Sequence, residues 1–274
     1  SMEENSMPVV ETEKRGQIFI VRINRPDRLN ALGTEVRTGL AEAWTEFKES
    51  KDLEIGVFTG SGRAFCAGED MKESLEKGTV GGSHLKVEDP LMAGTLEKPV
   101  IAAVNGYAMG GGFMLVEATD LRIAVPEAVF EVSEAKRWLL GGYNHGHYAN
   151  LPHALATEMA LGFRFTAQRF YEIGFVNQIV EADKLIDTAV AMGEHMLSLP
   201  PASRVNTTQM MREMRPKVPG ELQNLAEALK NHGDKEDLVE SRRAFAEKRT
   251  PNFAGWIEPE DRYNPPTLES LTSS

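Results

Sequence analysis

The chain of 274 residues contains a single cysteine, Cys66, so it cannot form a disulfide within itself. This fits a reducing compartment, and we expect a cytoplasmic protein. Long apolar runs are also missing. VIAAV at 100–104 is far shorter than the roughly 20 residues of a membrane helix. The acidic start, SMEENSMPVVE, lacks the apolar segment of a signal peptide. We therefore expect no membrane or secretory association.

Basic residues are fewer than acidic residues as well. The chain has 30 lysines and arginines against 41 acidic residues, which gives a formal net charge of −11. Phosphate backbones bind to basic surfaces, so this balance argues against nucleic acid as a partner. It does not exclude a small anionic ligand, because a few local cations or a helix N-terminus can bind one.

Short apolar strand patterns alternate with helical patterns over about two-thirds of the chain. Strands are expected at 17–24, 54–60, 98–106, 121–125 and 128–132. Residues 34–49 have apolar residues at helical spacing, with Thr34 as a plausible N-cap. A loop at 63–70 leads into a short helix, and helical patterns prevail after about residue 152. This alternation predicts an α/β core. No G-x-G-x-x-G or P-loop pattern occurs, so a dinucleotide fold is not indicated.

Three consecutive glycines, Gly110, Gly111 and Gly112, lie between a strand pattern and a helix pattern. Backbone N–H groups can approach a ligand closely where no Cβ intervenes, and the first N–H groups of a helix have no partner within it. Such donors can stabilise a carbonyl oxygen that gains negative charge. FCAGED at 65–70 also follows a strand, and its Glu69 N–H could be a second donor. The alternative is that the glycines only make tight turns, and the sequence does not show that the loops meet.

Four motifs in order carry a family resemblance. NRPDRLNAL at 24–32, AFCAGEDMKE at 64–73, KPVIAAVNGYAMGGG at 98–112 and AFAEKRTPNF at 244–253 resemble the enoyl-CoA hydratase/isomerase (crotonase) superfamily. The resemblance implies a spiral of ββα turns followed by a C-terminal helical trimerisation region. It divides the chain into a spiral core at 8–200, a helical region at 201–256 and a polar tail at 257–274. A homotrimer, or a hexamer of two trimers, is expected.

The resemblance also implies site residues. The Glu69 and Gly111 N–H groups would hold the oxygen of a thioester enolate. Coenzyme A would lie along two segments. The implied contacts are Arg28, Leu29, Ala31, Ala67, Gly68, Asp70, Met71 and Gly110. Lys248 matches a lysine that often reaches a phosphate of coenzyme A in a neighbouring subunit. Without the family, Lys248 would read as a lysine on a helix surface.

The acid/base residues depart from the family pattern. Hydratases of this family typically carry two glutamates, which together add water across a double bond. Met114 occupies the position of the first, and a thioether cannot transfer protons. Glu134 matches the second and is the predicted acid/base, although it could also be a surface glutamate near a helix start. Glu117, one helical turn after Met114, is a weaker substitute.

The segment RWLLGGYNHGHYANLP at 137–152 follows Glu134 and differs from the family. We expect a loop that brings Tyr143, His145 and His147 to the acyl pocket, together with Met114. Its side chains could replace the missing acid or base, or only shape the pocket. A metal site from His145, His147 and His153 is not favoured, because neither cysteine nor carboxylate accompanies them.

The sequence therefore predicts an acyl-CoA enzyme of hydratase/isomerase type with one glutamate and no metal or redox cofactor. The coenzyme A thioester is the substrate. A hydrolase or decarboxylase of an unusual acyl-CoA and a catalytically reduced member that still binds coenzyme A stay open as alternatives. Cys66 in FCAGED is not favoured as a nucleophile, because that position is structural in the family.

Overall fold

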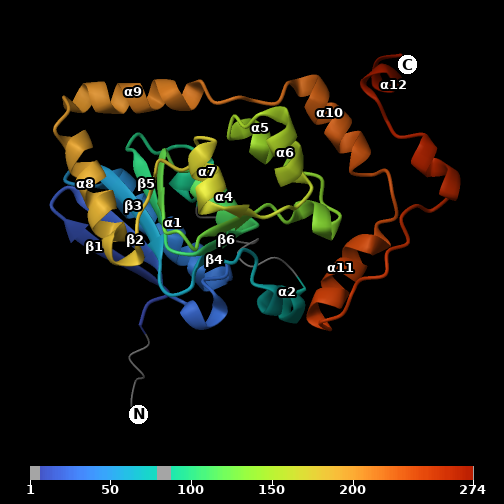
Figure 1. Ribbon diagram of the computed structural model, residues 1–274, viewed down its shortest axis with the longest axis horizontal. Helices are drawn as coiled ribbons and strands as arrows, with labels where there is room; N and C mark the ends of the chain where they lie inside the picture. Colours follow the sequence, from blue (N-terminus) through green and yellow to red (C-terminus); the bar gives the residue numbers. More distant parts are fainter. Residues whose placement is uncertain (1–6, 79–87, 274) are drawn as a thin grey trace, which may run out of the picture. The chain divides into compact units, whose positions relative to one another are not determined.

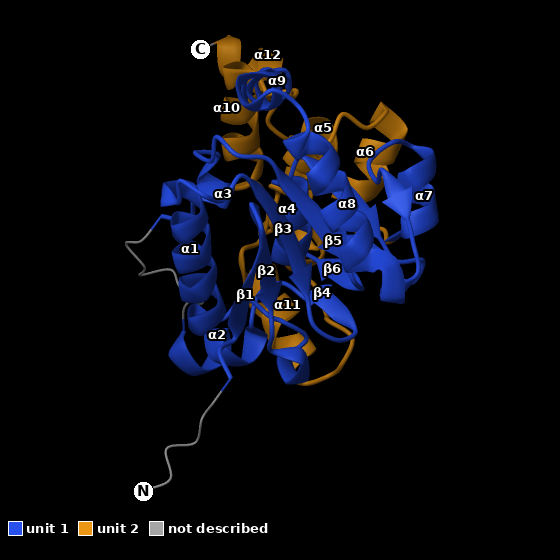
Figure 2. Ribbon diagram, turned by 90° about the vertical axis from the view of Figure 1, so that its left-hand side faces the viewer, with its two compact units in different colours: residues 1–131, 165–214 blue, residues 132–164, 215–274 orange. Residues whose placement is uncertain are grey.

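The computed structural model describes residues 7–78 and 88–273 (Figure 1). These residues form two compact units, coloured separately in Figure 2. Unit 1 contains residues up to 131 together with 165–214. Unit 2 contains residues 132–164 together with those from 215 onward. Within the described ranges, no helix is long and apolar enough to cross a membrane.

Unit 1 is built on a six-stranded sheet with strand order β1-β2-β3-β5-β7-β10. β1 (Val10–Arg15) is antiparallel to β2 (Ile18–Ile23), and the other neighbours are parallel. These are β3 (Ile55–Gly60), β5 (Val100–Val104), β7 (Leu121–Ala124) and β10 (Gln178–Ile179). All residues of β3 and β5 are buried, as expected of parallel strands covered on both faces. The strands predicted near 17–24, 54–60, 98–106 and 121–125 are confirmed.

Two helices cover opposite faces of this sheet (Figure 2). A Cβ atom at Gly56 of β3 would lie 3.0 Å from the indole of Trp44 in α1 (Thr34–Glu49). In α8 (Leu185–Leu197), a Cβ atom at Gly193 would lie 3.2 Å from Ile55. Residues 55 and 56 are consecutive in one strand, so their side chains point to opposite faces. The core therefore has a layer on each side of the sheet.

A second sheet of four short strands carries the glycine segments. Its order is β4 (Ala64–Cys66), β6 (Tyr107–Met109), β8 (Val129–Glu131) and β9 (Phe165–Thr166). β4, β6 and β8 are parallel. The strand predicted at 128–132 is confirmed, but the loop predicted at 63–70 is wrong over Ala64–Cys66. A three-residue strand is too short to show an alternating pattern.

The other helices of unit 1 are short, apart from α9 (Pro201–Glu213). They are η1 (Pro26–Arg28), α2 (Met71–Lys77), α3 (Pro90–Ala93), α4 (Gly111–Glu117), α7 (Ala167–Glu172) and η3 (Ala182–Lys184). The predicted N-cap at Thr34 is wrong, because Gly33 is the N-cap of α1. Its first N–H group, that of Thr34, donates instead to Glu73 Oε2 at 2.7 Å.

Unit 2 is helical. It contains η2 (Glu134–Arg137), α5 (Gly142–Tyr148), α6 (His153–Ala160), α10 (Gly220–Leu229), α11 (Glu236–Ala246), η4 (Pro259–Tyr263) and α12 (Leu268–Thr272). The loop expected after Glu134 is wrong, because residues 142–148 form α5. A Cβ atom at Gly146 would lie 2.6 Å from Ala156 Cα, so glycine allows α5 and α6 to pack tightly.

The two compact units are a division by contacts and do not test the predicted parts 8–200, 201–256 and 257–274. Residues 132–164 group with the C-terminal helices, and the polar tail 257–274 contains η4 and α12. α12 packs on α10 within unit 2. The predicted three-part division stays a prediction about function and assembly.

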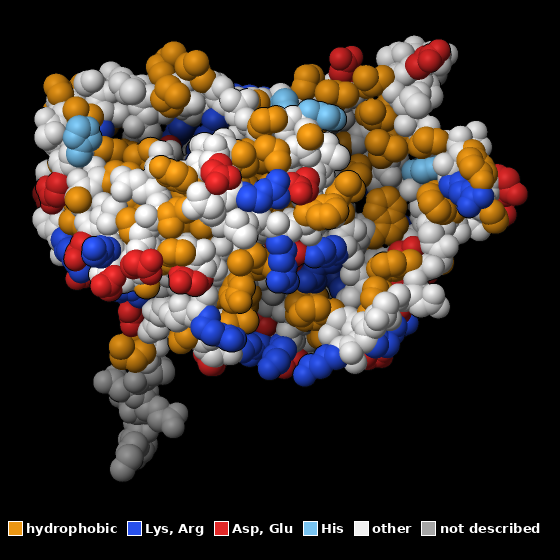
Figure 3. Space-filling view, in the orientation of Figure 1, with side chains coloured by type: hydrophobic (Ala, Val, Ile, Leu, Met, Phe, Trp, Pro, Cys, Tyr) orange, Lys and Arg blue, Asp and Glu red, His pale blue; other side chains and the backbone are white. Residues whose placement is uncertain are grey.

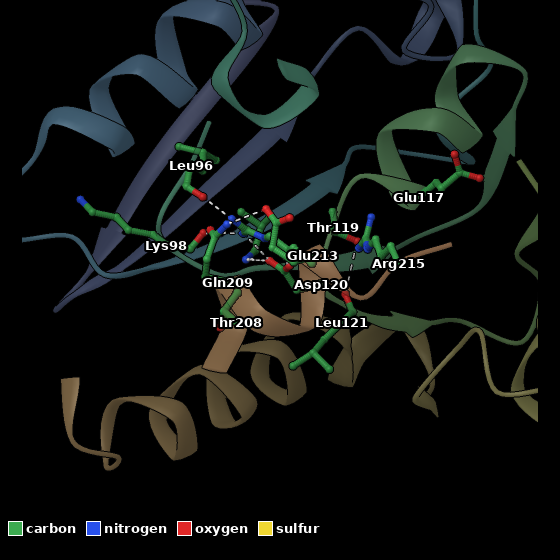
Figure 4. Close-up of polar contacts among 12 residues, drawn as sticks. Leu96, Lys98, Glu117, Thr119, Asp120, Leu121, Thr208, Gln209, Glu213 and Arg215 are labelled. Carbon is green, nitrogen blue, oxygen red and sulfur yellow. Dashed lines mark hydrogen bonds and ion pairs between the residues drawn. The ribbon is translucent and has the colours of Figure 1, made fainter. Parts of the chain in front are cut away.

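Arg212 joins α9 to the start of two strands of the large sheet. Its guanidinium makes two 2.8 Å contacts with the Asp120 carboxylate and donates to the carbonyl oxygens of Leu96 and Lys98. Figure 4 shows Leu96, Lys98 and Asp120 gathered beside Gln209 and Glu213 of α9. Asp120 in turn accepts the N–H of Val100, the first residue of β5. A bidentate pair of this kind fixes helix and sheet in one geometry.

We expect the Arg212→Leu variant to lower the free energy of unfolding by about 3 kcal/mol, because a largely buried carboxylate loses its partner. Urea unfolding of the variant and wild type measures this. Asn206→Ala on an exposed position of α9 is the control and should change stability by less than about 0.5 kcal/mol. Equal stabilities for Arg212→Leu and wild type would contradict the role given to this pair.

Candidate active site

The two glycine segments meet at the carboxyl ends of neighbouring strands. β4 leads into the AGED loop (residues 67–70), and β6 leads into the glycine triplet (residues 110–112). A Cβ atom at Gly68 would lie 2.6 Å from the carbonyl oxygen of Met109 and 3.4 Å from the Gly111 nitrogen. A Cβ atom at Gly112 would lie 2.1 Å from the Cys66 carbonyl oxygen. The two backbones touch where any side chain would separate them.

Gly111 is placed as an N–H donor. It is the first residue of α4, and Gly110 is the N-cap with φ 56°. The earliest intrahelical bond of this helix runs from the Met114 N–H to the Gly110 oxygen, at 3.2 Å. The N–H of Gly111 precedes that bond, so it has no acceptor inside the helix. The helix terminus adds a partial positive charge at the same point.

The segment DRLNA (residues 27–31) and Leu32 hold the AGED loop in place. The Leu32 N–H donates to the Gly68 oxygen at 2.7 Å, and the Ala67 N–H donates to the Leu29 oxygen at 3.0 Å. Leu32 Cδ1 lies 3.0 Å from where a Cβ atom of Gly111 would be. The segments implied for coenzyme A binding are therefore neighbours of the donor pair.

Asp70 closes the AGED loop and is almost wholly buried. Its carboxylate lies 2.6 Å from the Arg28 guanidinium and 3.4 Å from that of Arg25. The same carboxylate accepts the Glu73 N–H and so caps α2. The charges of Asp70 and Arg28 are therefore already paired with each other. Met71, the first residue of α2, is half-buried beside them, and Ala31 is buried.

Asn30 is a residue that the sequence analysis missed. It is fully buried in a left-handed conformation with φ 57°. Its side chain accepts the Arg25 N–H and donates to the oxygens of Ser61 and Ala64. An asparagine between DRL and AL is a signal that could have found it, because asparagine tolerates this backbone region better than most residues.

Met114 and Glu117 lie on α4 after the donor. Met114 is half-buried, whereas Glu117 is buried. The structure therefore places a thioether, and no carboxylate, one helical turn after the Gly110 cap. The side chain of Glu69 is bound to α2, because Ser74 Oγ donates to Glu69 Oε1 at 3.0 Å. The predicted role of Glu69 belongs to its backbone N–H group.

Glu134 begins η2 in unit 2 and pairs with His145 of α5. The His145 Nε2 atom lies 3.1 Å from Glu134 Oε1, and the two side chains are 12% and 16% exposed. Gly141 is the other neighbour, because a Cβ atom there would lie 2.3 Å from Glu134 Oε2. The carboxyl group is confined on two sides and keeps limited access to solvent.

The other predicted side chains of unit 2 lie elsewhere on α5 and just after α11. Tyr143 is exposed, and His147 Nε2 lies 3.2 Å from the Lys217 oxygen. Both line a cavity of about 550 Å³ among α5, α6 and α10. Figure 3 shows histidine and apolar side chains gathered over these helices. Lys248 is exposed two residues after the end of α11, with φ 54°.

Cys66 is unsuited to act as a nucleophile. It is fully buried, and burial raises the pKa of its thiol to about 12. A thiol with such a pKa is almost entirely protonated at neutral pH. As for metals, no group of three or more histidine, cysteine or acidic side chains in residues 7–78 and 88–273 is arranged to hold a metal ion. His145 and His147 have different partners, as described above.

Comparison with known proteins identifies the family. The family model for enoyl-CoA hydratase/isomerase matches residues 13–256. The chain belongs to the enoyl-CoA hydratase/isomerase family. It is 35% identical to the (E)-benzylidenesuccinyl-CoA hydratase of Thauera aromatica, covering 91% of this chain and all of that protein. An enoyl-CoA hydratase of Mycobacterium tuberculosis is 33% identical, with 90% and 97% covered.

Solved structures confirm the crotonase fold of mixed sheets and C-terminal helices. The carnitinyl-CoA hydratase from Mycobacterium avium aligns with a TM-score of 0.76 and 30% identity, covering 91% of this chain and 99% of that one. The resemblance inferred from the four motifs is thereby confirmed. The roles of individual residues stay predictions.

Glu73 links the AGED region to α1 by accepting the Thr34 N–H. Burial raises the pKa of Glu73, but hydrogen bonds from Lys77 and Thr34 outweigh this effect and lower the pKa to about 2. A folded pKa below the ordinary 4.5 stabilises the folded state above pH 4.5. That contribution disappears as the pH falls from there toward 2.

We expect Glu73→Gln to lower the free energy of unfolding by about 1 kcal/mol at neutral pH, as for loss of a helix cap. The difference from wild type should shrink as the pH is lowered below about 4.5, and urea unfolding at stepped pH measures it. Glu76→Gln, on an exposed position of α2, is the control. A difference that grows on acidification would contradict the assignment.

Proposed function

We propose that this protein is an acyl-CoA hydratase/dehydratase, which adds water to the C2–C3 double bond of an enoyl-CoA or removes it. The observation that carries the proposal is the backbone contact between Gly68 and Gly111, which brings two loops with N–H donors to one point. Relatives whose names describe hydratases align along nearly their whole length.

The donor pair serves the thioester. We assign the Glu69 and Gly111 N–H groups to the carbonyl oxygen of the acyl-CoA. When water attacks C3, the electron pair of the double bond moves toward this oxygen and forms an enolate. Donors fixed by two strands and a helix stabilise that charge with little reorganisation. No metal is needed for this step.

Glu134 is assigned as the acid/base. It follows β8 by three residues, and β8 pairs with β6, the strand that leads into Gly110. The assignment rests on its match to the second glutamate of the family pattern. Its carboxylate accepts a proton from water as the oxygen bonds to C3, and then returns that proton to C2. The sum is addition of one water molecule.

Isomerisation is the second candidate, favoured by Met114. Where a second glutamate would assist water, α4 offers a thioether. One carboxylate is enough to move a proton from one carbon of the acyl chain to another through the same enolate. Hydrolysis, decarboxylation and binding without turnover are further outcomes that a product analysis distinguishes.

Coenzyme A contacts are assigned by motif. We place the cofactor portion of the substrate along Arg28, Leu29 and Ala31 and along the AGED loop. Ala67, Gly68, Asp70, Met71 and Gly110 complete this assignment. Asp70 also caps α2 and pairs with Arg28, so it holds the loop in place for these contacts. Lys248 toward a phosphate, a trimer or hexamer and a cytoplasmic location remain predictions.

We expect a panel of straight, branched and aryl enoyl-CoAs to contain a substrate that gains the mass of one water. Glu134→Gln should lower kcat on that substrate roughly 10²-fold or more, because the amide cannot exchange the proton. Mass spectrometry of the products and steady-state kinetics check both. Glu221→Gln, an exposed glutamate of α10, is the control with unchanged kcat.

The product identifies the reaction class. A shifted double bond without mass gain would favour the isomerase, and free coenzyme A would favour the hydrolase. Undiminished turnover by Glu134→Gln would remove Glu134 from the mechanism.

We also expect Gly68→Ala to lower kcat/KM roughly 10²-fold, because the new Cβ must push apart the two loops that carry the donors. Gly78→Ala is a matched control. Gly78 likewise has a positive φ, of 71° against 94° at Gly68, but a Cβ there would meet no atom within 4 Å. The control shares the backbone strain and lacks the clash. Equal activities of the two variants would contradict the donor assignment.

A further inference from the structure

Glu134 and His145 form a pair whose chemistry can be read from the atoms in contact. The His145 Nε2 atom lies 3.1 Å from Glu134 Oε1. An ionised carboxylate has only lone pairs to offer, so Nε2 must carry the hydrogen when Glu134 is charged. His145 is then the donor, and Glu134 Oε1 is the acceptor.

Gly141 makes room for this pair. Its φ is −56°, an ordinary helical value, so the backbone there does not require glycine. Glycine is required here by the lack of space, because a Cβ atom at residue 141 would lie 2.3 Å from Glu134 Oε2 and 3.2 Å from Glu134 Cδ. Gly141 and His145 are four residues apart and therefore share one face at the start of α5. His145 contacts Oε1, and Gly141 is the neighbour of Oε2.

The two histidines of α5 are not equivalent. His147 lies 3.2 Å from the oxygen of Lys217 and lines the cavity among α5, α6 and α10. Glu134 is absent from the lining of that cavity. Of the two histidines, it is therefore His145 that contacts the Glu134 carboxylate.

We infer that His145 is the positioning residue for Glu134, with Gly141 as the gap that admits the carboxylate. The inference rests on the proposed function. The hydrogen bond to Oε1 fixes the orientation of the carboxyl group and leaves Oε2 to take the proton from water and return it to C2. Water oxygen bonds to C3, and the electron pair of the double bond passes to the thioester oxygen and back.

This pair takes over one part of what a second glutamate does elsewhere. Two carboxylates can orient one water molecule between them. With Met114 in the first position, Glu134 alone must present the right lone pair to the water. A displacement of about 1 Å can cost roughly 10²-fold in rate, so a carboxylate without a fixed orientation would be a poor base.

The test is a double-mutant cycle in the full chain, with the panel substrate that gives the highest kcat/KM. His145→Leu should lower kcat roughly 10²-fold while changing KM less than about 3-fold. His145→Gln, whose amide N–H can donate in place of Nε2, should retain kcat within about 5-fold of wild type. In the Glu134→Gln background, His145→Leu should change kcat less than about 2-fold, because it acts through Glu134.

Gly141→Ala supplies an independent variant in case His145→Leu fails to fold. Its backbone suits alanine, and its new Cβ should displace Glu134 and lower kcat by more than about 10-fold. Gly220→Ala is the matched control, since a Cβ there meets nothing within 4 Å. Circular dichroism and thermal unfolding establish that each variant is folded.

Two results would overturn the inference. One is a wild-type kcat for folded His145→Leu and Gly141→Ala. The other is a kcat loss of equal size in the presence and absence of Glu134, which would show that His145 acts by another route. If Glu134→Gln keeps full activity, the proposed function itself fails, and this outcome is distinct from both.

Discussion

The contact between two peptide backbones, at Gly68 and at Gly111, is the constraint on which the remaining structure of the site depends. Parallel strands bring their carboxyl ends to one edge, but side chains normally keep the following loops apart. Here Gly68 approaches the Met109 oxygen and Gly112 approaches the Cys66 oxygen, at distances that exclude a Cβ atom. The surrounding elements therefore have to hold two loops together without interlocking side chains.

Those elements supply hydrogen bonds and charge in place of side-chain packing. The Asn30 side chain donates to the Ala64 oxygen of β4, and the Leu32 N–H donates to the Gly68 oxygen. The Asp70 carboxylate accepts a hydrogen bond from Arg28. Each buried polar atom in this set has a defined partner, which is what a rigid polar network requires. Rigidity matters here because a donor stabilises a developing charge only if it already points at it.

The sequence was informative where a pattern was long or a motif was specific. The strands around β2, β3 and β5 and the helix α1 were predicted correctly, because their apolar residues recur over a full element. β4 was missed because three residues carry no period. The histidine segment was predicted as a loop because it departs from the family pattern, whereas residues 142–148 form α5 and Gly146 allows α5 to pack on α6.

The candidate site was predicted in outline only. The motifs pointed to Glu69, Gly111 and Glu134, but no motif showed that Gly68 and Gly111 touch. That contact joins positions more than forty residues apart. Asn30, Gly141 and the link between His145 and Glu134 depend on local geometry that spacing does not encode. Helix periodicity would have put Gly141 and His145 on one face, if the helix had been recognised.

The burial of Cys66 has a practical consequence. The only thiol of the chain lies beneath Gly112 and stays protonated at neutral pH. A cysteine introduced at an exposed position would therefore be the sole group to accept a maleimide or spin label. The wild-type protein thus already has the background that spectroscopic labelling usually requires engineers to create. Pairs of such labels, one in each compact unit, would measure the distance between the units in solution.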